Sequence, residues 1–326
     1  MLQPPEGLYL CVDAGGTKTA AAIANAEGEI VGRGYGGSAN MSELGVETSS
    51  TEILRAVDQA ISSLRLPSGV AANGHTAFIG DKYRCRVHFE RIWVGISGCD
   101  SPNDVINMTR RLEHSFVDDS PGGPSRHRIH RPGAEPAFFV SLYLRDVREE
   151  RGHGHLFGDP GSGYHMGLTA IAMAADDHGL GHEREGGLAA VLRKVYRVES
   201  TADVPARAHD VPMDLDPVAA SNARKLRIAS LAPHVLNLST TCPLAACVLT
   251  RVTGALADDI AVLESHAKSK GLSGSGGLVI TGGLGTQDRY FQSLLSALNE
   301  RGVTLGWADR IDDAAGAGAA ALSEIR

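Results

Sequence analysis

The chain has 326 residues, of which 43% are hydrophobic, and it carries a formal net charge of −7 at pH 7. A chain of this length and apolar content buries a substantial core, and its length favours two domains. The acidic balance excludes bulk electrostatic attraction to nucleic acid, and the one basic run, Ser125 to Arg131, lacks interleaved aromatic residues that would stack on bases. No apolar run reaches the length of a membrane-spanning helix, so we expect no membrane partner.

The five cysteines are odd in number and have no C-x-x-C spacing, so they predict neither a disulfide framework nor a zinc site. Their pattern indicates a reducing, cytoplasmic setting, and no secretory signal pattern precedes Leu8. The 13 histidines do not predict a metal site either, because His153, His155 and His165 have no carboxylate or thiol at ligand spacing.

Three short strands are predicted within Leu8 to Gly36, separated by a glycine turn and a Glu-Gly turn. Asp13 closes the first strand, and Gly15, Gly16 and Thr17 make the first turn. Glycines let backbone amides approach an anion closely, and a carboxylate beside them suits Mg²⁺. The pairing indicates a grip for nucleotide phosphates and their metal. An ordinary β-hairpin with a glycine-rich turn explains the same residues equally well.

Between this region and the C-terminus, apolar residues at helical spacing predict mainly helices. In the first half we expect a helix over Glu47 to Leu64, a loop over Arg65 to Tyr83 and a helix over Asn103 to Phe116. In the second half, Ser200 to Asp216 is expected to be a surface loop between helices. The helices expected there cover Leu168 to Asp176, Leu188 to Val198, Pro217 to Leu238 and Pro243 to Lys270.

A second glycine cluster lies near the C-terminus. Leu278 to Ile280 is expected to be a buried strand, and Gly282, Gly283 and Gly285 to form a turn that leads into a helix from Asp288. A further strand is expected over Val303 to Ala308, followed by an Asp-capped, Ala- and Gly-rich helix within Ile311 to Leu322. A strand, glycine turn and helix can seat an adenosine against the backbone. A plain βα unit with a tight turn is the alternative.

Together these motifs resemble the sugar kinase–actin–Hsp70 ATPase superfamily, and within it the N-acetylglucosamine kinase family and its relatives, the BadF-type ATPases. The similarity covers Leu8 to about Phe116 and Gly152 to the end of the chain. Its other segments are GGSANMSELG (Gly36 to Gly45), VGISGCD (Val94 to Asp100), GHGHLFGDPGSGYHMG (Gly152 to Gly167) and KLRIASLAPHVL (Lys225 to Leu236).

The resemblance implies an α/β, two-lobed actin-like ATPase (ribonuclease H-like) fold with a central cleft. The N-terminal lobe would cover residues 1–120, a divergent connecting segment 121–151, and the C-terminal lobe 152–326. The last helix is a candidate to pack back on the N-terminal lobe. Related kinases are commonly dimers, so a homodimer is one candidate for the oligomeric state.

The activity that the resemblance implies is transfer of a phosphoryl group from ATP, with Mg²⁺, to the 6-hydroxyl of N-acetylglucosamine. Glucosamine differs from that sugar by an acetyl group whose pocket the sequence does not locate. Asp159 has a second reading, in which its side chain fixes the GDPGSG turn through its own backbone amides. The implied ligand groups are Asp13 for Mg²⁺; Gly15, Gly16, Thr17 and Lys18 for phosphate; Gly282, Gly283 and Gly285 for adenosine; and Asn40, Ser97, Gly98 and Asp159 for the sugar.

One segment departs from the family pattern. Val117 to Gly152 lacks the G-T-G-[ST] turn of the second phosphate loop, and Asp118 and Asp119 are the only carboxylates near the expected position of the catalytic base. Losing that loop would remove much of the positioning and charge stabilisation on which phosphoryl transfer depends. A divergent pseudo-kinase and a misassigned splice site or reading frame both explain the gap, and the abrupt return of similarity at Gly152 favours the second.

Two other functions therefore stay open. A non-catalytic binder of nucleotide or sugar is compatible with the missing phosphate loop. A BadF-type ATPase that activates a reductase is the other, although the five cysteines lack a suitable motif for an iron–sulfur cluster and Asn40 favours the kinase.

Overall fold

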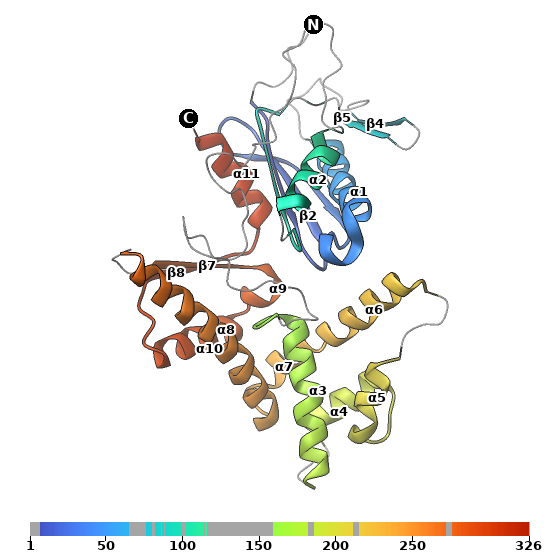
Figure 1. Cartoon of the computed structure of the whole chain (residues 1–326), viewed down its shortest axis with the longest axis vertical. Helices are drawn as coiled ribbons and strands as arrows, with labels where there is room; N and C mark the ends of the chain where they lie inside the picture. The colour runs from blue at the N-terminus through green and yellow to red at the C-terminus, as the bar shows by residue number, and fades with distance from the viewer. Residues whose placement is uncertain are drawn as a thin grey trace, which may run out of the picture. The chain divides into compact units, whose positions relative to one another are not determined.

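The structure is a computed structural model that describes residues 7–64, 76–79, 82–85, 87, 89–99, 102–113, 115, 159–181, 186–210, 215–271 and 276–325. These residues form two compact units (Figure 1). Unit 1 comprises the described residues up to 115 together with 313–325, and unit 2 comprises 159–312. Asp118, Asp119 and the divergent segment lie outside the described residues.

Unit 1 contains a four-stranded sheet. Its order is β3-β2-β1-β6, with β1 and β2 antiparallel, β2 and β3 antiparallel, and β1 and β6 parallel. The strands β1, β3 and β6 consequently run in the same direction and end at one edge of the sheet, where Ala14, Gly36 and Ile96 lie. The bounds are Tyr9–Ala14 for β1, Thr19–Ala24 for β2, Ile30–Gly36 for β3 and Arg91–Ile96 for β6.

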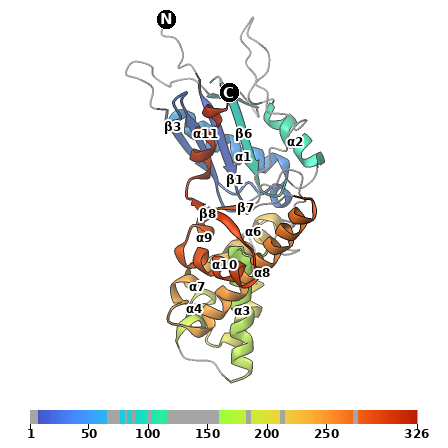
Figure 2. The same ribbon diagram turned by 90° about the vertical axis from the view of Figure 1, so that its left-hand side faces the viewer.

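Helices cover both faces of this sheet (Figure 2). Helices α1 (Met41–Ser62) and α2 (Pro102–Glu113) pack on one face, and α11 (Ala314–Glu324) packs on the other. Alternation along β1 explains the division, because Leu10 and Val12 point into the core with α1 while Cys11 points toward α11. The small residues of α11 permit a close approach: a Cβ on Gly318 would lie 2.4 Å from the Cys11 sulfur.

Helix α1 begins six residues earlier than the sequence predicts, with a kink at Gly45, whose φ is 73°. Glycine adopts a positive φ at little energetic cost, so the chain kinks at Gly45 and then continues as a helix. The predicted loop over Arg65 to Tyr83 is wrong in part, because β4 (Thr76–Ile79) and β5 (Lys82–Cys85) form an antiparallel pair. Four-residue strands show too few alternations to be recognised by pattern.

Unit 2 is mainly helical. Its core is built from residues of several helices, with Met166, Leu188, Leu192, Leu231 and Leu294 all fully buried. The helices are α3 (Gly163–Gly179), α4 (Gly187–Tyr196), α5 (Val204–Ala208), α6 (Pro217–Ala229), α7 (Ala232–Leu238), α8 (Pro243–Ser269), α9 (Gly282–Gly285) and α10 (Asp288–Glu300).

The two strands of unit 2 form a parallel pair, β7 (Gly276–Thr281) with β8 (Leu305–Ile311). The sequence predicts a buried strand over Leu278 to Ile280, but only Leu278 is buried, at 3% exposed, and Val279 is 36% exposed. An alternating strand buries one face and leaves the other open, which a short apolar run does not reveal.

Two helix predictions in unit 2 are corrected. The single helix expected over Pro217 to Leu238 is two helices, because Pro233 has no amide hydrogen and its ring clashes with the carbonyl of Ala229 in a continuous helix. The loop expected over Ser200 to Asp216 contains a 3₁₀ turn and α5. Ser200 caps that turn, its hydroxyl accepting the Ala202 amide. In a segment rich in polar residues, a single capping serine does not stand out.

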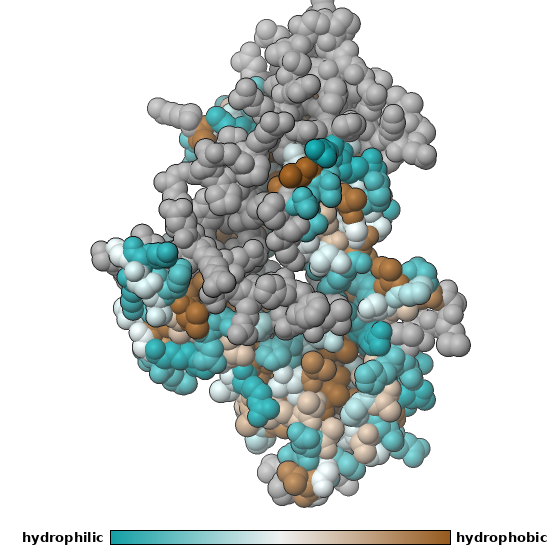
Figure 3. All heavy atoms as spheres, viewed as in Figure 1, coloured by the Kyte–Doolittle hydropathy of each residue, from teal (hydrophilic) through white to brown (hydrophobic). Residues whose placement is uncertain are grey.

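Among the helices that the structure describes, none combines the length and apolarity needed to cross a lipid bilayer. On the face of unit 2 visible in Figure 3, hydrophobic residues lie scattered among hydrophilic ones. The large apolar side chains that stay exposed include Leu168, Leu180 and Trp307.

Candidate functional site

The turn between β1 and β2 is tied to the segment that follows β3. The Gly15 amide donates to the Lys18 carbonyl at 2.9 Å, and the Gly15 carbonyl accepts the Ala39 amide at 3.1 Å. The Ser38 hydroxyl donates to the Gly16 carbonyl at 2.9 Å. The Gly15 amide is therefore used within the turn and is not available to a ligand. Within the described residues, the Gly16 and Thr17 amides have no acceptor, so these two are the donors that an anion could use.

Asp13 stands at the end of β1, beside this turn. Its side chain reaches solvent, yet neighbouring protein displaces part of its water, which raises the pKa of the carboxyl. Lys18 opposes that shift and Asp313 adds to it. The Asp13 carboxylate makes no hydrogen bond or ion pair to any residue that the structure describes. A carboxylate that is unpaired and close to a second anion suits a cation.

Asp313 is the residue of this cluster that sequence reasoning missed. It caps α11 by accepting the Gly316 amide at 2.9 Å and forms an ion pair with Arg33 of β3 at 2.6 Å. Partial burial pushes the pKa of Asp313 up, but the hydrogen bonds from Arg33 and Gly316 outweigh burial and hold that pKa below its usual value. The sequence predicts an Asp-capped helix, but no local signal links it to β1 or β3.

Asn40, Ser97 and Gly98 meet at the same edge of the sheet. The Ser97 amide donates to the Ala14 carbonyl at 2.9 Å, and the Met41 amide donates to the Ser97 carbonyl at 2.8 Å. The Asn40 amide nitrogen donates to the Ser97 hydroxyl at 3.3 Å. Gly98, with φ at 72°, leaves no room for a side chain, because a Cβ there would lie 2.2 Å from Asn40 Oδ1.

Asn40 is fully engaged in holding this corner together. It caps α1 by accepting the Glu43 amide, accepts the Ser42 hydroxyl at 2.8 Å, and donates to the Glu43 carboxylate and to Ser97. These four contacts use both donors and both acceptor positions of a side-chain amide, and the residue is only 6% exposed. Asn40 thus positions Ser97, whose hydroxyl keeps its own proton available for donation. The spacing Asn40-x-x-Glu43 matches a capping box, a local pattern that could have identified Asn40 as a helix cap.

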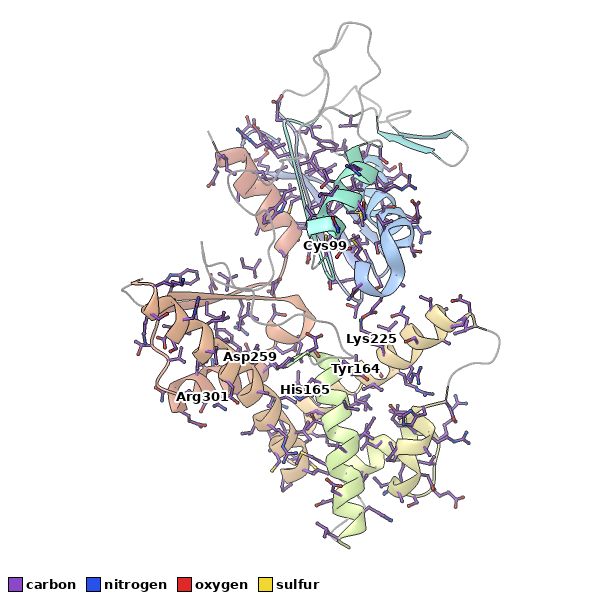
Figure 4. The ribbon with its side chains drawn as sticks, in the orientation of Figure 1. Cys99, Tyr164, His165, Lys225, Asp259 and Arg301 are labelled. Carbon is purple, nitrogen blue, oxygen red and sulfur yellow. The ribbon has the colours of Figure 1, made fainter. Side chains whose placement is uncertain are left out.

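Asp159 lies in unit 2, in the turn that leads into α3. Its carbonyl accepts the Ser162 amide at 3.0 Å, and Ser162 caps α3 by accepting the His165 amide at 3.0 Å. The Asp159 carboxylate acts electrostatically on two neighbours. Burial lowers the pKa of His165 and Asp159 partly offsets this, whereas burial and Asp159 both raise the pKa of Tyr290. Figure 4 shows His165 with Tyr164 at the N-terminal end of α3.

The second glycine turn begins where β7 ends. Gly282 has φ at 90°, and a Cβ on Gly282 or Gly283 would meet nothing within 4 Å. Gly285 differs, since a Cβ there would lie 2.1 Å from the Ile280 side chain. Arg310 fixes the far end of the turn: it donates to the Thr286 carbonyl at 2.9 Å and pairs with Asp288 at 2.5 Å. The backbone of Gly282 and Gly283 is thus uncovered by neighbouring side chains, while Arg310 holds the end of the same turn in place.

Unit 1 therefore brings together eight of the predicted residues, and unit 2 contains the other four that are described. No group of three or more described His, Cys, Asp or Glu side chains is placed to hold a metal ion. The eight residues of unit 1 are Asp13, Gly15, Gly16, Thr17, Lys18, Asn40, Ser97 and Gly98, and those of unit 2 are Asp159, Gly282, Gly283 and Gly285.

No protein-family model and no curated protein matches the chain. Solved structures do. A presumed N-acetylglucosamine kinase from Chromobacterium violaceum is 19% identical, with 98% of this chain and 100% of that chain covered and a TM-score of 0.54. A ROK family glucokinase from Streptomyces griseus, solved with glucose and AMPPNP, is 13% identical over 98% of both chains, with a TM-score of 0.48. The chain has the mixed α/β fold of the actin-like ATPase sugar kinases.

Proposed function

We propose that the chain is an ATP-dependent kinase that phosphorylates N-acetylglucosamine at its 6-hydroxyl. The observation that carries the proposal is the convergence of Asp13, the Gly15–Lys18 turn and Ser97 at one edge of the unit 1 sheet. A free carboxylate, two free amides and a positioned hydroxyl supply what a phosphate–metal pair and a sugar hydroxyl require.

Each of these groups has a defined task under the proposal. The Gly16 and Thr17 amides bind phosphate oxygens, and the Lys18 ammonium adds positive charge beside them. Asp13 would hold Mg²⁺, directly or through water, and the bound ion would neutralise charge on the phosphates of ATP. Ser97 hydrogen-bonds the sugar, and Asn40 orients Ser97 by donating to its hydroxyl. The family resemblance gives Asp159 as a further candidate ligand of the sugar. Gly282 and Gly283 let the adenosine approach the backbone closely.

The general base is the part of the proposal that rests on sequence alone. Asp118 and Asp119 are its candidates, and both lie outside the described residues. An Asp at that position would accept the proton of the 6-hydroxyl as the phosphoryl group arrives, so Asp118→Asn or Asp119→Asn should lower kcat by about a hundredfold or more. The variant that leaves kcat unchanged identifies the carboxylate that is not the base.

The experiment is a coupled assay of ADP release with N-acetylglucosamine, glucosamine and glucose as separate substrates. We expect turnover that depends on the sugar, is fastest with N-acetylglucosamine and is lost in Asp13→Asn. Asp176→Asn, a charge change on α3, is the matched control and should keep full activity. A rate of ADP release that is the same with and without sugar would favour a BadF-type ATPase over the kinase.

A non-catalytic binder is the second candidate, because Val117 to Gly152 lacks the G-T-G-[ST] turn of the second phosphate loop. Calorimetric titration with ATP and with N-acetylglucosamine separates the two functions. Binding of both ligands by a folded protein that forms no phosphorylated sugar would identify the binder. Product formation at any rate that Asp13→Asn abolishes would exclude it.

A further inference from the structure

Both backbone groups of one glycine in unit 2 are held by side chains. The Gly161 carbonyl accepts the hydroxyl of Tyr290, from α10, at 2.7 Å. The Gly161 amide donates to Nδ1 of His165, from α3, at 3.3 Å. Gly161 comes two residues after Asp159, so these two bonds fix the turn in which Asp159 lies. We call this arrangement the Gly161 clamp.

Packing around this turn excludes a side chain at Gly161. Gly161 is buried with φ at 82°, and a Cβ there would lie 2.7 Å from the Tyr290 oxygen and 2.8 Å from the Leu256 side chain. Glycine is the residue that fits this position, because it tolerates the positive φ and has no Cβ to clash. Tyr290 is itself 3% exposed, so the donor is rigidly placed and desolvated. A hydrogen bond in such surroundings is stronger than one in water.

The protonation states match the geometry. Because burial lowers the pKa of His165, its imidazole is neutral at neutral pH and Nδ1 can accept the Gly161 amide. Burial and the Asp159 carboxylate raise the pKa of Tyr290, so its hydroxyl keeps the proton that it donates. His165 as acceptor and Tyr290 as donor thus bind the two peptide groups that flank the Gly161 Cα.

We propose that Tyr290 and His165 are positioning residues that act through Gly161 to orient Asp159 toward the sugar. This inference rests on the proposed function, in which Asp159 is a sugar ligand. Neither side chain needs to touch the substrate. Their effect is to hold the carboxylate in its binding position before the sugar arrives, which lowers the ordering cost of binding.

The test combines a structural readout with a kinetic one. Tyr290→Phe removes only the hydroxyl, and His165→Leu removes the acceptor; His165→Asn restores an acceptor oxygen close to the position of Nδ1. Tyr196→Phe is the matched control, because the buried Tyr196 hydroxyl has no hydrogen-bond partner in the described part of the chain. Hydrogen exchange is followed in the peptide spanning Asp159 to Tyr164, and KM and kcat are measured for sugar and ATP.

We expect exchange in that peptide to quicken about tenfold in Tyr290→Phe and His165→Leu, as for the loss of one buried hydrogen bond. KM for the sugar should rise about tenfold, while kcat and KM for ATP stay within about twofold. His165→Asn should recover most of both effects, and Tyr196→Phe should show neither. A purely structural role would not produce this split between the two substrates.

The failing outcomes are distinguishable. Unchanged exchange in both variants would show that the clamp does not hold the turn and would overturn the inference. Faster exchange with an unchanged KM for the sugar would overturn the positioning role and leave the kinase assignment standing. A wild-type protein that neither binds nor phosphorylates a sugar would overturn the proposed function, and the positioning role with it, whatever the exchange shows.

Discussion

The two glycine-rich turns of this chain look alike in sequence and are built differently. In unit 1, the turn after β1 is tied to its neighbours by hydrogen bonds: its carbonyls accept from Ala39 and Ser38, and the Gly15 amide donates to the Lys18 carbonyl. In unit 2, the turn after β7 is open, with nothing near a Cβ on Gly282 or Gly283. Several glycines of unit 1, such as Gly34 and Gly98, are required by packing, whereas Gly282 has room for a Cβ and is favoured by its φ of 90°. Gly283 is under neither constraint.

Substituting a packed glycine should have the largest effect. A Cβ on Gly34 of β3 would lie 2.0 Å from the Ala56 carbonyl and 2.3 Å from the Ala60 nitrogen, both backbone atoms of α1. Gly34→Ala should therefore lower the free energy of unfolding by about 3 kcal/mol or leave unit 1 unfolded. Urea denaturation followed by circular dichroism measures the change. A loss below about 1 kcal/mol would show that α1 can move away from the sheet at little cost.

Asp13→Asn should separate activity from stability. Kinase activity should fall by about a hundredfold or more, because a charge beside the phosphates is lost. Stability at pH 7 should rise. Burial raises the pKa of Asp13 in the folded chain, so wild-type stability falls as pH increases from the unfolded pKa through the folded one, and removing the charge relieves that penalty.

Thermal melts at pH 7 and kinetic assays on the same preparation check this prediction. A variant that is both inactive and less stable than wild type would indicate that Asp13 is a structural residue. A cation bound at Asp13 would add to wild-type stability, so the melts should be repeated with EDTA.

The open turn gives a prediction of intermediate size. Gly283→Val adds a side chain where a Cβ meets no neighbour, so the free energy of unfolding should change by less than about 0.5 kcal/mol. The affinity for ATP should nevertheless fall about tenfold if adenosine lies against this backbone. Calorimetric titration with ATP measures it, with Gly179→Val, at the end of α3, as the control because a Cβ there also meets nothing within 4 Å. Equal ATP affinity in Gly283→Val and wild type would place the adenosine elsewhere.

The smallest effect is expected at the ion pair that joins α11 to β3. Both Arg33 and Asp313 are about two-fifths exposed, so Arg33→Gln should lower the free energy of unfolding by only about 0.5 to 1 kcal/mol at pH 7. Because the pKa of Asp313 is lowered in the folded chain, its contribution is present above the unfolded value and is lost as pH falls through the folded one. Denaturation at pH 7 and pH 3 should show a smaller difference between wild type and variant at pH 3 than at pH 7.

Much of the local structure follows from the sequence alone. The three strands of Leu8 to Gly36, the helix from Asp288 and the Asp-capped last helix depend on apolar spacing and capping within a few residues, and the structure confirms them. The motifs also predict the sugar-kinase fold. Local signals fail where the cause is a single residue, as at Pro233, or where strands are too short to show a pattern, as in β4 and β5.

Tertiary structure decides which of these local pieces work together. Asp313 comes near Asp13 and Arg33 only because α11 packs on the face of the unit 1 sheet that contains Cys11. Tyr290 reaches Gly161 across 129 positions of sequence, and no spacing rule connects them. Asn40, read from sequence as a ligand, has all its hydrogen-bonding groups engaged once Ser97 and Glu43 are placed. The sequence determined which chemical groups are present, through short-range patterns. Long-range packing determined which of them are free to bind.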